Sequence, residues 1–123
     1  NPHAGENGLF GDEEITTIGP FCRAFAEMND IRVNGPLPAD TLFRDALAGK
    51  YDGVVAAYHD QAMIPLKLAG VGATVNITMG LPFVRTSPDH GVARDIARTG
   101  KASPEGMHRA VEMAVQLLKA DAQ

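Results

Sequence analysis

The feature that most constrains the fold is an uninterrupted run of small and apolar residues at positions 53–58. Such a run is typical of a strand that is buried on both faces of a sheet. Apolar residues at helical spacing lie on both sides of the run, at positions 38–47 and 61–68. Because strands and helices alternate in this way, we predict an α/β fold built around a layered sheet.

Capping residues and glycines predict where the helices begin and end. Asp12 is the expected N-cap of a first helix, in which Pro20 should produce a kink or a broken turn. Ser103 and Pro104 should begin a C-terminal helix with a long apolar stripe. The two internal helices are expected to end at the glycines that follow them, which are Gly49, Gly70 and Gly72.

The remaining elements are short. Strands are predicted at residues 31–33, 74–78 and 82–86, and one or two helical turns at residues 91–97. The sequence has no internal repeat or linker, and its 123 residues suffice for one hydrophobic core. We therefore predict a single domain over residues 1–123.

Charge and cysteine content argue against several classes of protein. The net charge of -4 does not suit a nucleic-acid surface, which needs clustered Lys and Arg. A lone cysteine, Cys22, excludes an intrachain disulfide framework and suits a reducing compartment. No apolar run approaches the roughly 20 residues that span a bilayer. We expect a cytoplasmic protein that binds neither nucleic acid nor membrane.

Two histidines lie where strands are expected to end and polar chain begins, His3 in an NPHAGE motif and His59 in a YHDQ motif. Imidazole is the commonest neutral ligand for divalent metals, and strand ends hold side chains within reach of a ligand. The residues alone leave three interpretations open: metal ligands, an acid–base couple, or two structural histidines. With no evident third ligand and no initiator Met, we expect the C-terminal piece of a larger enzyme.

Four other polar residues are candidates for a site. Asp40 lies at the start of the helix at 38–47, where its charge complements the helix dipole. If its loop faces His3, Asp40 could instead act as a base or hold a substrate ammonium. Lys67, Asn76 and Arg85 lie in apolar surroundings. Lys and Arg together suit a phosphate and an amide can fix orientation, whereas the alternative is that Lys67 and Arg85 are surface residues.

A resemblance to a known family rests on motifs along most of the chain. The loop at 90–97 has the pattern His-Gly-x-Ala-x-Asp-Ile-Ala and is followed by Gly-Lys-Ala-x-Pro. It resembles the adenosine-binding loop of the isocitrate and isopropylmalate dehydrogenase fold. The motifs NPHAGE, NGPLPADT, YHDQ, VNITMGLPFVRTS and DHG, in this order, resemble the 4-hydroxythreonine-4-phosphate dehydrogenase family.

The resemblance implies a set of site residues and partners. A divalent metal (zinc, magnesium, manganese or cobalt) would bind two histidines here and a third from upstream, at the interface of a homodimer. NAD would bind the adenosine loop, and a phosphorylated small molecule would be the substrate. The implied residues are His3 and His59 for the metal, Lys67, Asn76 and Arg85 for the substrate, and His90, Gly91 and Asp95 for NAD.

The implied reaction is the oxidation of 4-phosphooxy-L-threonine by NAD, followed by decarboxylation, in pyridoxal phosphate synthesis. One alternative is a sister dehydrogenase that acts on a phosphorylated sugar acid, such as threonate or erythronate phosphate, or on an aromatic cis-diol acid. Another is a non-catalytic binding module that retains the fold. The isolated fragment is expected to be inactive, because it lacks a metal ligand and part of the cofactor cleft.

Overall fold

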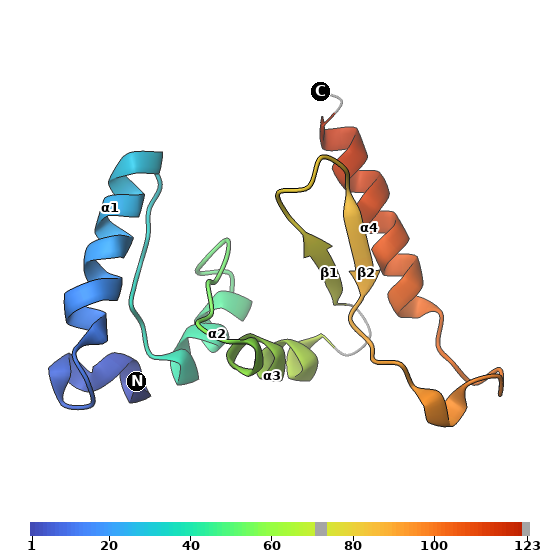
Figure 1. Cartoon of the computed structure of the whole chain (residues 1–123), viewed down its shortest axis with the longest axis horizontal. Helices are drawn as coiled ribbons and strands as arrows, with labels where there is room; N and C mark the ends of the chain where they lie inside the picture. The colour runs from blue at the N-terminus through green and yellow to red at the C-terminus, as the bar shows by residue number, and fades with distance from the viewer. Residues whose placement is uncertain (71–73, 122–123) are drawn as a thin grey trace. The chain divides into compact units, whose positions relative to one another are not determined.

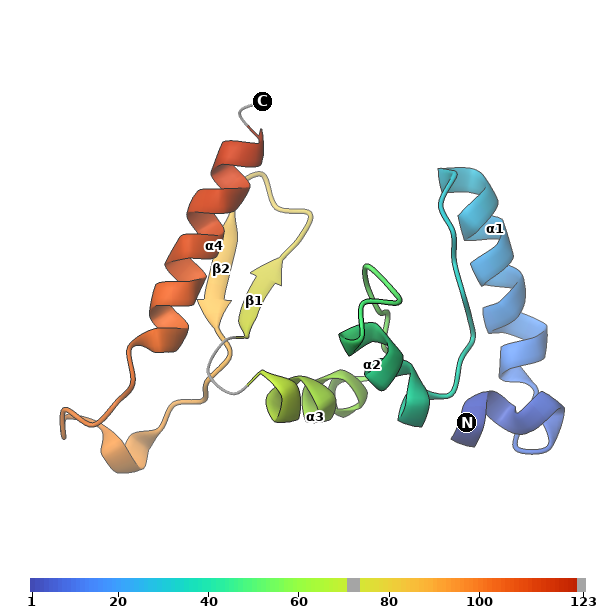
Figure 2. The same ribbon diagram turned by 180° about the vertical axis from the view of Figure 1, so that it is seen from behind.

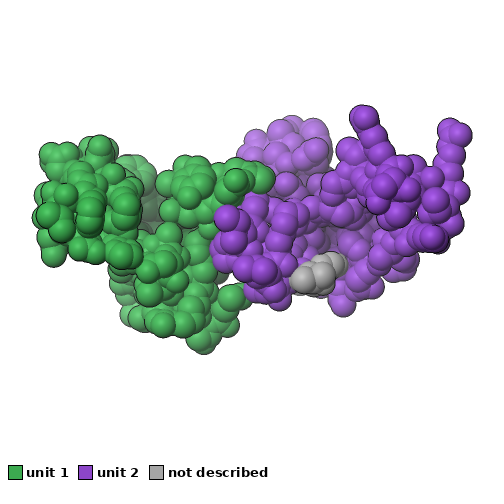
Figure 3. Space-filling model, turned by 90° about the horizontal axis from the view of Figure 1, so that it is seen from below, with its two compact units in different colours: residues 1–61 green, residues 62–123 purple. Residues whose placement is uncertain are grey.

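The computed structural model describes residues 1–70 and 74–121, and the chain divides into two compact units, Asn1–Gln61 and Ala62–Gln123 (Figure 3). The prediction of a single domain over residues 1–123 stays a prediction.

Unit 1 begins with two short helices that lead into a longer one. The first, η1 (Pro2–Gly8), is followed by a π-helical segment, η2 (Glu14–Ile18), and then by α1 (Gly19–Asn29). The change from π to α geometry falls immediately before Pro20, where the sequence predicts a kink or a broken turn. A proline lacks the N–H that a continuous helix would need at this point.

Asp12 starts this helical segment differently from the prediction. Its backbone carbonyl accepts bonds from the amides of Ile15 and Thr16, at 3.0 and 2.8 Å, and from the hydroxyl of Thr16 at 2.9 Å. The N-cap position belongs to Glu13, and no side chain caps this helix among the described residues. The residue is therefore predicted correctly as a helix start, but the prediction of a capping carboxylate is wrong.

Two internal helices form as expected. Helix α2 (Ala39–Leu47) ends where Gly49, with a φ of +81°, donates its amide to the carbonyl of Ala46 at 2.9 Å. Helix α3 (His59–Ala69) begins two residues earlier than predicted and continues through Pro65. The amide of Gly70 closes it on the carbonyl of Leu66 at 2.9 Å, while Gly72 lies outside the described residues.

Two predicted strands do not form. Residues 31–33 and 53–58 are irregular, and Val55 is 97% exposed. A strand is held by hydrogen bonds to its neighbours, and the sheet in the described residues consists of two strands elsewhere in the chain. An apolar run without such a partner is not held in an extended conformation.

Unit 2 is a hairpin covered by a helix. Strand β1 (Val75–Thr78) confirms the strand predicted at 74–78, and it pairs antiparallel with β2 (Arg85–Pro88) in the register Val75↔Pro88 to Thr78↔Arg85. The second strand lies three residues beyond its predicted start, because residues 80–83 form the bend that reverses the chain. Figures 1 and 2, from opposite sides, show α4 (Glu105–Asp121) lying along this hairpin.

The contact between α4 and β2 centres on Ala110, which is 2% exposed. The hydroxyl of Thr86 on β2 donates to the carbonyl of Ala110 at 2.8 Å. The helix starts after Ser103, whose Oγ accepts a bond from the amide of Glu105 at 3.4 Å, as the sequence predicts. Between β2 and α4, a single turn, η3 (Arg94–Ile96), occupies the stretch predicted to be helical at 91–97.

The mixture of helices and strands confirms the α/β class. Most large apolar side chains lie at the surface of the described chain, for example Phe21 at 64% and Met28 at 82% exposure. Within residues 1–70 and 74–121, no helix has the length and apolar character that crossing a bilayer requires.

Candidate functional site

Polar residues gather at a hollow in unit 1. Its walls come from η1 and from the first residues of α2 and α3. The lining residues are Asn1, Pro2, His3, Ala39, Asp40, Tyr58 and Gln61.

His3 is held in this hollow by two carboxylates. Its Nδ1 lies 2.6 Å from Oε1 of Glu6, and its Nε2 lies 3.6 Å from Oδ2 of Asp40. The hydrogen bond with Glu6, and then the charge of Asp40, raise the pKa of the His3 imidazole above its usual value. From the sequence, Asp40 is expected to have a chemical role only if its loop faces His3. The 3.6 Å distance between the two side chains shows that it does.

The contact between His3 and Glu6 depends on an unusual backbone. All residues from 3 to 7 have φ between 41° and 77°, a left-handed turn that costs L-residues other than glycine roughly 1–2 kcal/mol each. The Asn1 amide holds the turn by donating to Glu13 at 2.6 Å and to Glu14 at 2.8 Å. Strain of this kind persists only where surrounding contacts enforce it, and it is often found at functional sites.

His59 has a similar carboxylate partner but does not line the hollow. Its Nδ1 lies 2.7 Å from Oδ1 of Asp60, and its side chain is 79% exposed. The neighbouring Gln61 accepts a bond from the amide of Ala57 at 2.7 Å, which fixes the start of α3. Within residues 1–70 and 74–121, no group of three or more His, Cys, Asp and Glu side chains could hold a metal. Convergence of His3 and His59 on one ion stays a prediction.

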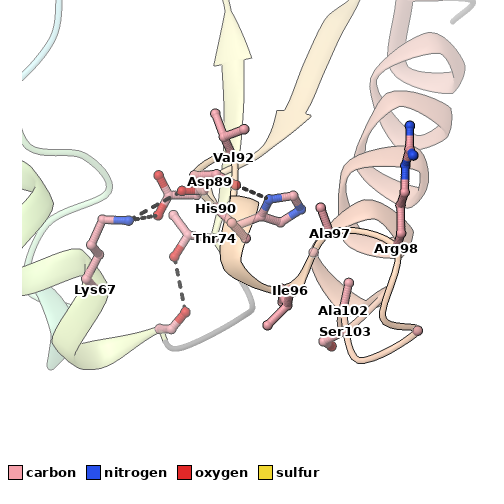
Figure 4. A pocket seen from close by; sticks show the side chains of 15 residues that line it. Lys67, Thr74, Asp89, His90, Val92, Ile96, Ala97, Arg98, Ala102 and Ser103 are labelled. Carbon is pink, nitrogen blue, oxygen red and sulfur yellow. Dashed lines mark hydrogen bonds and ion pairs between the residues drawn. The ribbon is translucent and has the colours of Figure 1, made fainter.

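A larger cavity, of about 590 Å³, lies in unit 2 (Figure 4). It is bounded by the end of α3, the loop that follows β2, and the start of α4. His90 and Gly91, predicted to hold NAD, both line it, whereas Asp95 does not. The cavity also brings in Lys67, which the sequence predicts as a substrate ligand.

Lys67 contacts the first residue of the predicted cofactor loop. Its Nζ lies 3.2 Å from Oδ2 of Asp89 and 3.3 Å from the backbone carbonyl of the same residue. Figure 4 shows the lysine side chain reaching across to both oxygens. The sequence predicts Asp89 as the first residue of a cofactor loop at 89–95, but it does not predict the contact of Asp89 with Lys67.

A glycine lets α4 approach His90. A Cβ on Gly106 would lie 3.2 Å from Cβ of Pro88 and 3.3 Å from Cδ2 of His90, which is closer than side chains normally pack. The imidazole Nδ1 of His90 is also 3.1 Å from the carbonyl of Gly91. Sequence reasoning missed Gly106, and its only signal is a glycine in the first turn of a helix, where it is an unfavourable residue.

The other two predicted substrate residues lie on the hairpin. Asn76 pairs with Ser87 and Arg85 with Thr78, so both candidates lie on the same face of the two strands. Thr86, on the opposite face, bonds to α4, so Asn76 and Arg85 lie on the face away from that helix. The guanidinium of Arg85 donates to Oγ1 of Thr78 at 2.6 Å, and both candidates are exposed and do not line the cavity.

The chain is similar to proteins of known family. The family model described as pyridoxal phosphate biosynthetic protein PdxA matches residues 1–114. A curated relative from Pectobacterium atrosepticum, named D-threonate 4-phosphate dehydrogenase, is 59% identical over 95% of this chain and 36% of its own length. Another from Beijerinckia indica, named 4-hydroxythreonine-4-phosphate dehydrogenase, is 56% identical over 95% of this chain and 34% of its own length.

A solved structure gives the same result. The 4-hydroxythreonine-4-phosphate dehydrogenase from Burkholderia phymatum superposes with a TM-score of 0.74 at 50% identity, over 95% of this chain and 36% of the other. The chain therefore spans about a third of the length of the relatives that it matches.

Proposed function

Because the chain belongs to the family of the pyridoxal phosphate biosynthetic protein PdxA, we propose that it forms part of an NAD-dependent, metal-assisted dehydrogenase. The observation that carries this proposal is the pairing of each motif histidine with a carboxylate through Nδ1, at 2.6 Å for His3 and 2.7 Å for His59. Histidines that bind metals commonly donate their second ring N–H to a carboxylate in this way.

The two histidines fit a divalent metal. With Nδ1 directed to Glu6 or Asp60, the Nε2 atom of each ring is the one that can coordinate an ion. Imidazole ligands bind zinc and cobalt well, and they bind manganese and magnesium less strongly. A catalytic zinc site needs about three protein ligands. We propose that the third ligand lies in a part of the protein outside this chain, at the interface of a cytoplasmic homodimer.

The cavity in unit 2 fits the adenosine half of NAD. A Cβ placed on Gly91 would meet no atom within 4 Å, so a ligand can approach the backbone closely there. The apolar wall that includes Val92 and Ile96 suits a base, and the ring of His90 offers a polar group beside it. Asp95 lies in η3 outside the lining, so a contact from its carboxylate to the ribose stays a prediction.

The proposed substrate is 4-phosphooxy-L-threonine, which would be oxidised to 2-amino-3-oxo-4-phosphooxybutanoate and then lose carbon dioxide, in pyridoxal phosphate synthesis. A metal held by His3 and His59 would lower the pKa of the substrate hydroxyl, and NAD held at the loop of His90 would take up the hydride from the same carbon. Arg85 and Asn76, on one face of the hairpin, would hold the phosphate end together with Lys67. Asp40, which lies 3.6 Å from His3, would accept the hydroxyl proton or hold the substrate ammonium.

A second candidate substrate is D-threonate 4-phosphate, in which a hydroxyl replaces the ammonium. The observation in its favour is the 59% identity to the Pectobacterium atrosepticum protein of that name, against 56% to the Beijerinckia indica 4-hydroxythreonine-4-phosphate dehydrogenase. The residue that should distinguish the two substrates is Asp40. A nearby carboxylate forms a stronger hydrogen bond with a charged ammonium than with a neutral hydroxyl.

The test is an assay of the full-length protein with NAD and each of the two substrates. We expect turnover with at least one of them, loss of turnover after chelation, and recovery when zinc, cobalt, manganese or magnesium is added back. An Asp40→Asn variant should lose more activity towards the amino substrate than towards the hydroxy acid. A folded protein that binds metal but turns over neither substrate would support the non-catalytic alternative instead.

A further inference from the structure

The ion pair between Lys67 and Asp89 joins two parts of the proposed active site that are 22 residues apart in sequence. Lys67 lies near the end of α3, and Asp89, directly after β2, is the first residue of the proposed cofactor loop. Both residues line the same cavity as His90 and Gly91 (Figure 4). A side chain proposed to hold substrate phosphate therefore also contacts the segment proposed to hold NAD.

The contact fixes both the side chain and the backbone of Asp89. An ammonium group has three donors, and Lys67 directs two of them at this residue, one to the carboxylate and one to the main-chain carbonyl. The side chain of Asp89 is 21% exposed, compared with 56% for Lys67. A partly buried carboxylate is costly unless a charge pairs with it, so separating Asp89 from Lys67 is unfavourable. With both oxygens held, the first residue of the loop has little freedom left.

We propose that Asp89 is a positioning residue, which uses Lys67 to fix the start of the loop at 89–97 and so prepares that loop for NAD. This inference rests on the proposed function, because it assumes that the loop holds the cofactor. It also gives Lys67 a second role besides holding phosphate. Substitution of Lys67 should then weaken NAD as well as substrate.

The experiment measures NAD dissociation constants of the full-length protein by calorimetry for Asp89→Asn, Lys67→Gln and the double variant. Asparagine keeps the shape of Asp89 and removes its charge. Amide hydrogen exchange over residues 89–97, measured without NAD, reports whether the loop is fixed. Glu105→Gln is the matched control, because it breaks another carboxylate pair in unit 2, with Arg109 at 2.9 Å, at a residue outside the cavity lining.

We expect each single variant to raise the dissociation constant of NAD about three- to tenfold, as for a partly exposed charge pair. The double variant should be no weaker than the single ones, because the two residues act through one contact. Exchange over residues 89–97 should become faster in all three. The control should change neither quantity. Additive effects on NAD, or exchange as slow as in the wild type, would overturn the proposal.

A separate variant distinguishes this proposal from the cofactor site on which it rests. If His90→Ala leaves NAD affinity unchanged, the cofactor does not bind at this loop and the proposed NAD site is wrong. In that case, hydrogen exchange in Asp89→Asn still tests whether Asp89 fixes the loop at 89–97, because that measurement is made without NAD. If His90→Ala weakens NAD but Asp89→Asn changes neither affinity nor exchange, the site is right and the role of Asp89 is wrong.

Discussion

Strand β1 and the run at 53–58 are both predicted as strands, but β1 alone forms one. The run at 53–58 is the more apolar of the two, yet Val55 is 97% exposed. The partner of β1 begins at Arg85, seven residues after Thr78, so the hairpin closes locally. A strand buried on both faces in a parallel sheet needs neighbours from distant parts of a chain. Apolar content therefore shows how strongly a segment needs burial, and it does not show where its partner is.

The proposed site residues show the same contrast between elements that have local partners and elements that need distant ones. In unit 1, His3 and His59 have oriented rings, but nothing in the described chain completes a metal site around them. In unit 2, the hairpin, the loop and α4 together enclose a cavity from local elements.

The largest effect should come from the proposed metal ligands. In the full-length protein, His59→Ala should lower turnover at least about a hundredfold, since even the loss of a partner that only orients a ligand commonly costs 10–100-fold. Metal content, measured by mass spectrometry after dialysis, should fall in parallel while the thermal midpoint changes little. The control is His108→Ala, on the exposed surface of α4. Full metal content in the His59 variant would contradict the proposed site.

The second prediction concerns the run at 53–58. If another part of the full-length protein covers this run, Val55→Asp should reduce the free energy of unfolding by about 3 kcal/mol, because it buries an unpaired charge. Chemical denaturation of the full-length protein measures the change. Val55→Ile keeps the segment apolar and serves as the control. A loss below about 0.5 kcal/mol would show that the run stays exposed in the full-length protein as well.

The third prediction tests the hairpin face. Arg85→Ala should raise the Michaelis constant for the phosphorylated substrate about ten- to a hundredfold, because a charge-assisted hydrogen bond contributes roughly 1.5–3 kcal/mol. Arg85→Lys should recover only part of the loss, since the planar fork of arginine is gone. Steady-state kinetics at saturating NAD provide the measurement. An unchanged Michaelis constant in the alanine variant would remove Arg85 from the phosphate site.

The smallest effect is expected at the exposed end of α2. The Lys50 ammonium, and then Arg44, hold the pKa of the Asp45 carboxyl below its ordinary value of 3.8. A lowered carboxyl pKa stabilises the folded state above the unfolded pKa, and this stabilisation is lost as the pH falls through the folded value. Asp45→Asn should therefore lower the thermal midpoint slightly at neutral pH, with the difference shrinking below pH 3.8. A difference that grows in acid would contradict this sign.

Much of the fold follows from local sequence signals. Caps and glycines predict the end of α2 at Gly49 and the start of α4 after Ser103, because both depend on residues within one helical turn. Strand β1 is predicted for the same reason, since its partner is close in sequence. The strands expected at 31–33 and 53–58 fail because pairing is not a local property. The start of β2 is misplaced because the residues of the bend at 80–83 also suit an extended chain.

The sequence predicts which residues belong to the candidate site, but it does not predict how those residues are arranged in space. Asp40 faces His3 because of a left-handed turn at residues 3–7, for which the sequence offers only the single glycine Gly5. Lys67 has the chemistry of a phosphate ligand, but its pair with Asp89 depends on how the end of α3 meets the loop after β2. Contacts between elements 22 residues apart leave no periodic pattern in a sequence.

Gly106 sets the stability of α4 against the space beside His90. Alanine would be the better helix former at that position, by roughly 1 kcal/mol. The added methyl group would nevertheless press on the imidazole of His90 and on Pro88. To accept this alanine, His90 or Pro88 would have to shift by a few tenths of an ångström in the proposed cofactor pocket. The residue that would most stabilise the first turn of α4 is therefore not the residue that best fits the proposed pocket.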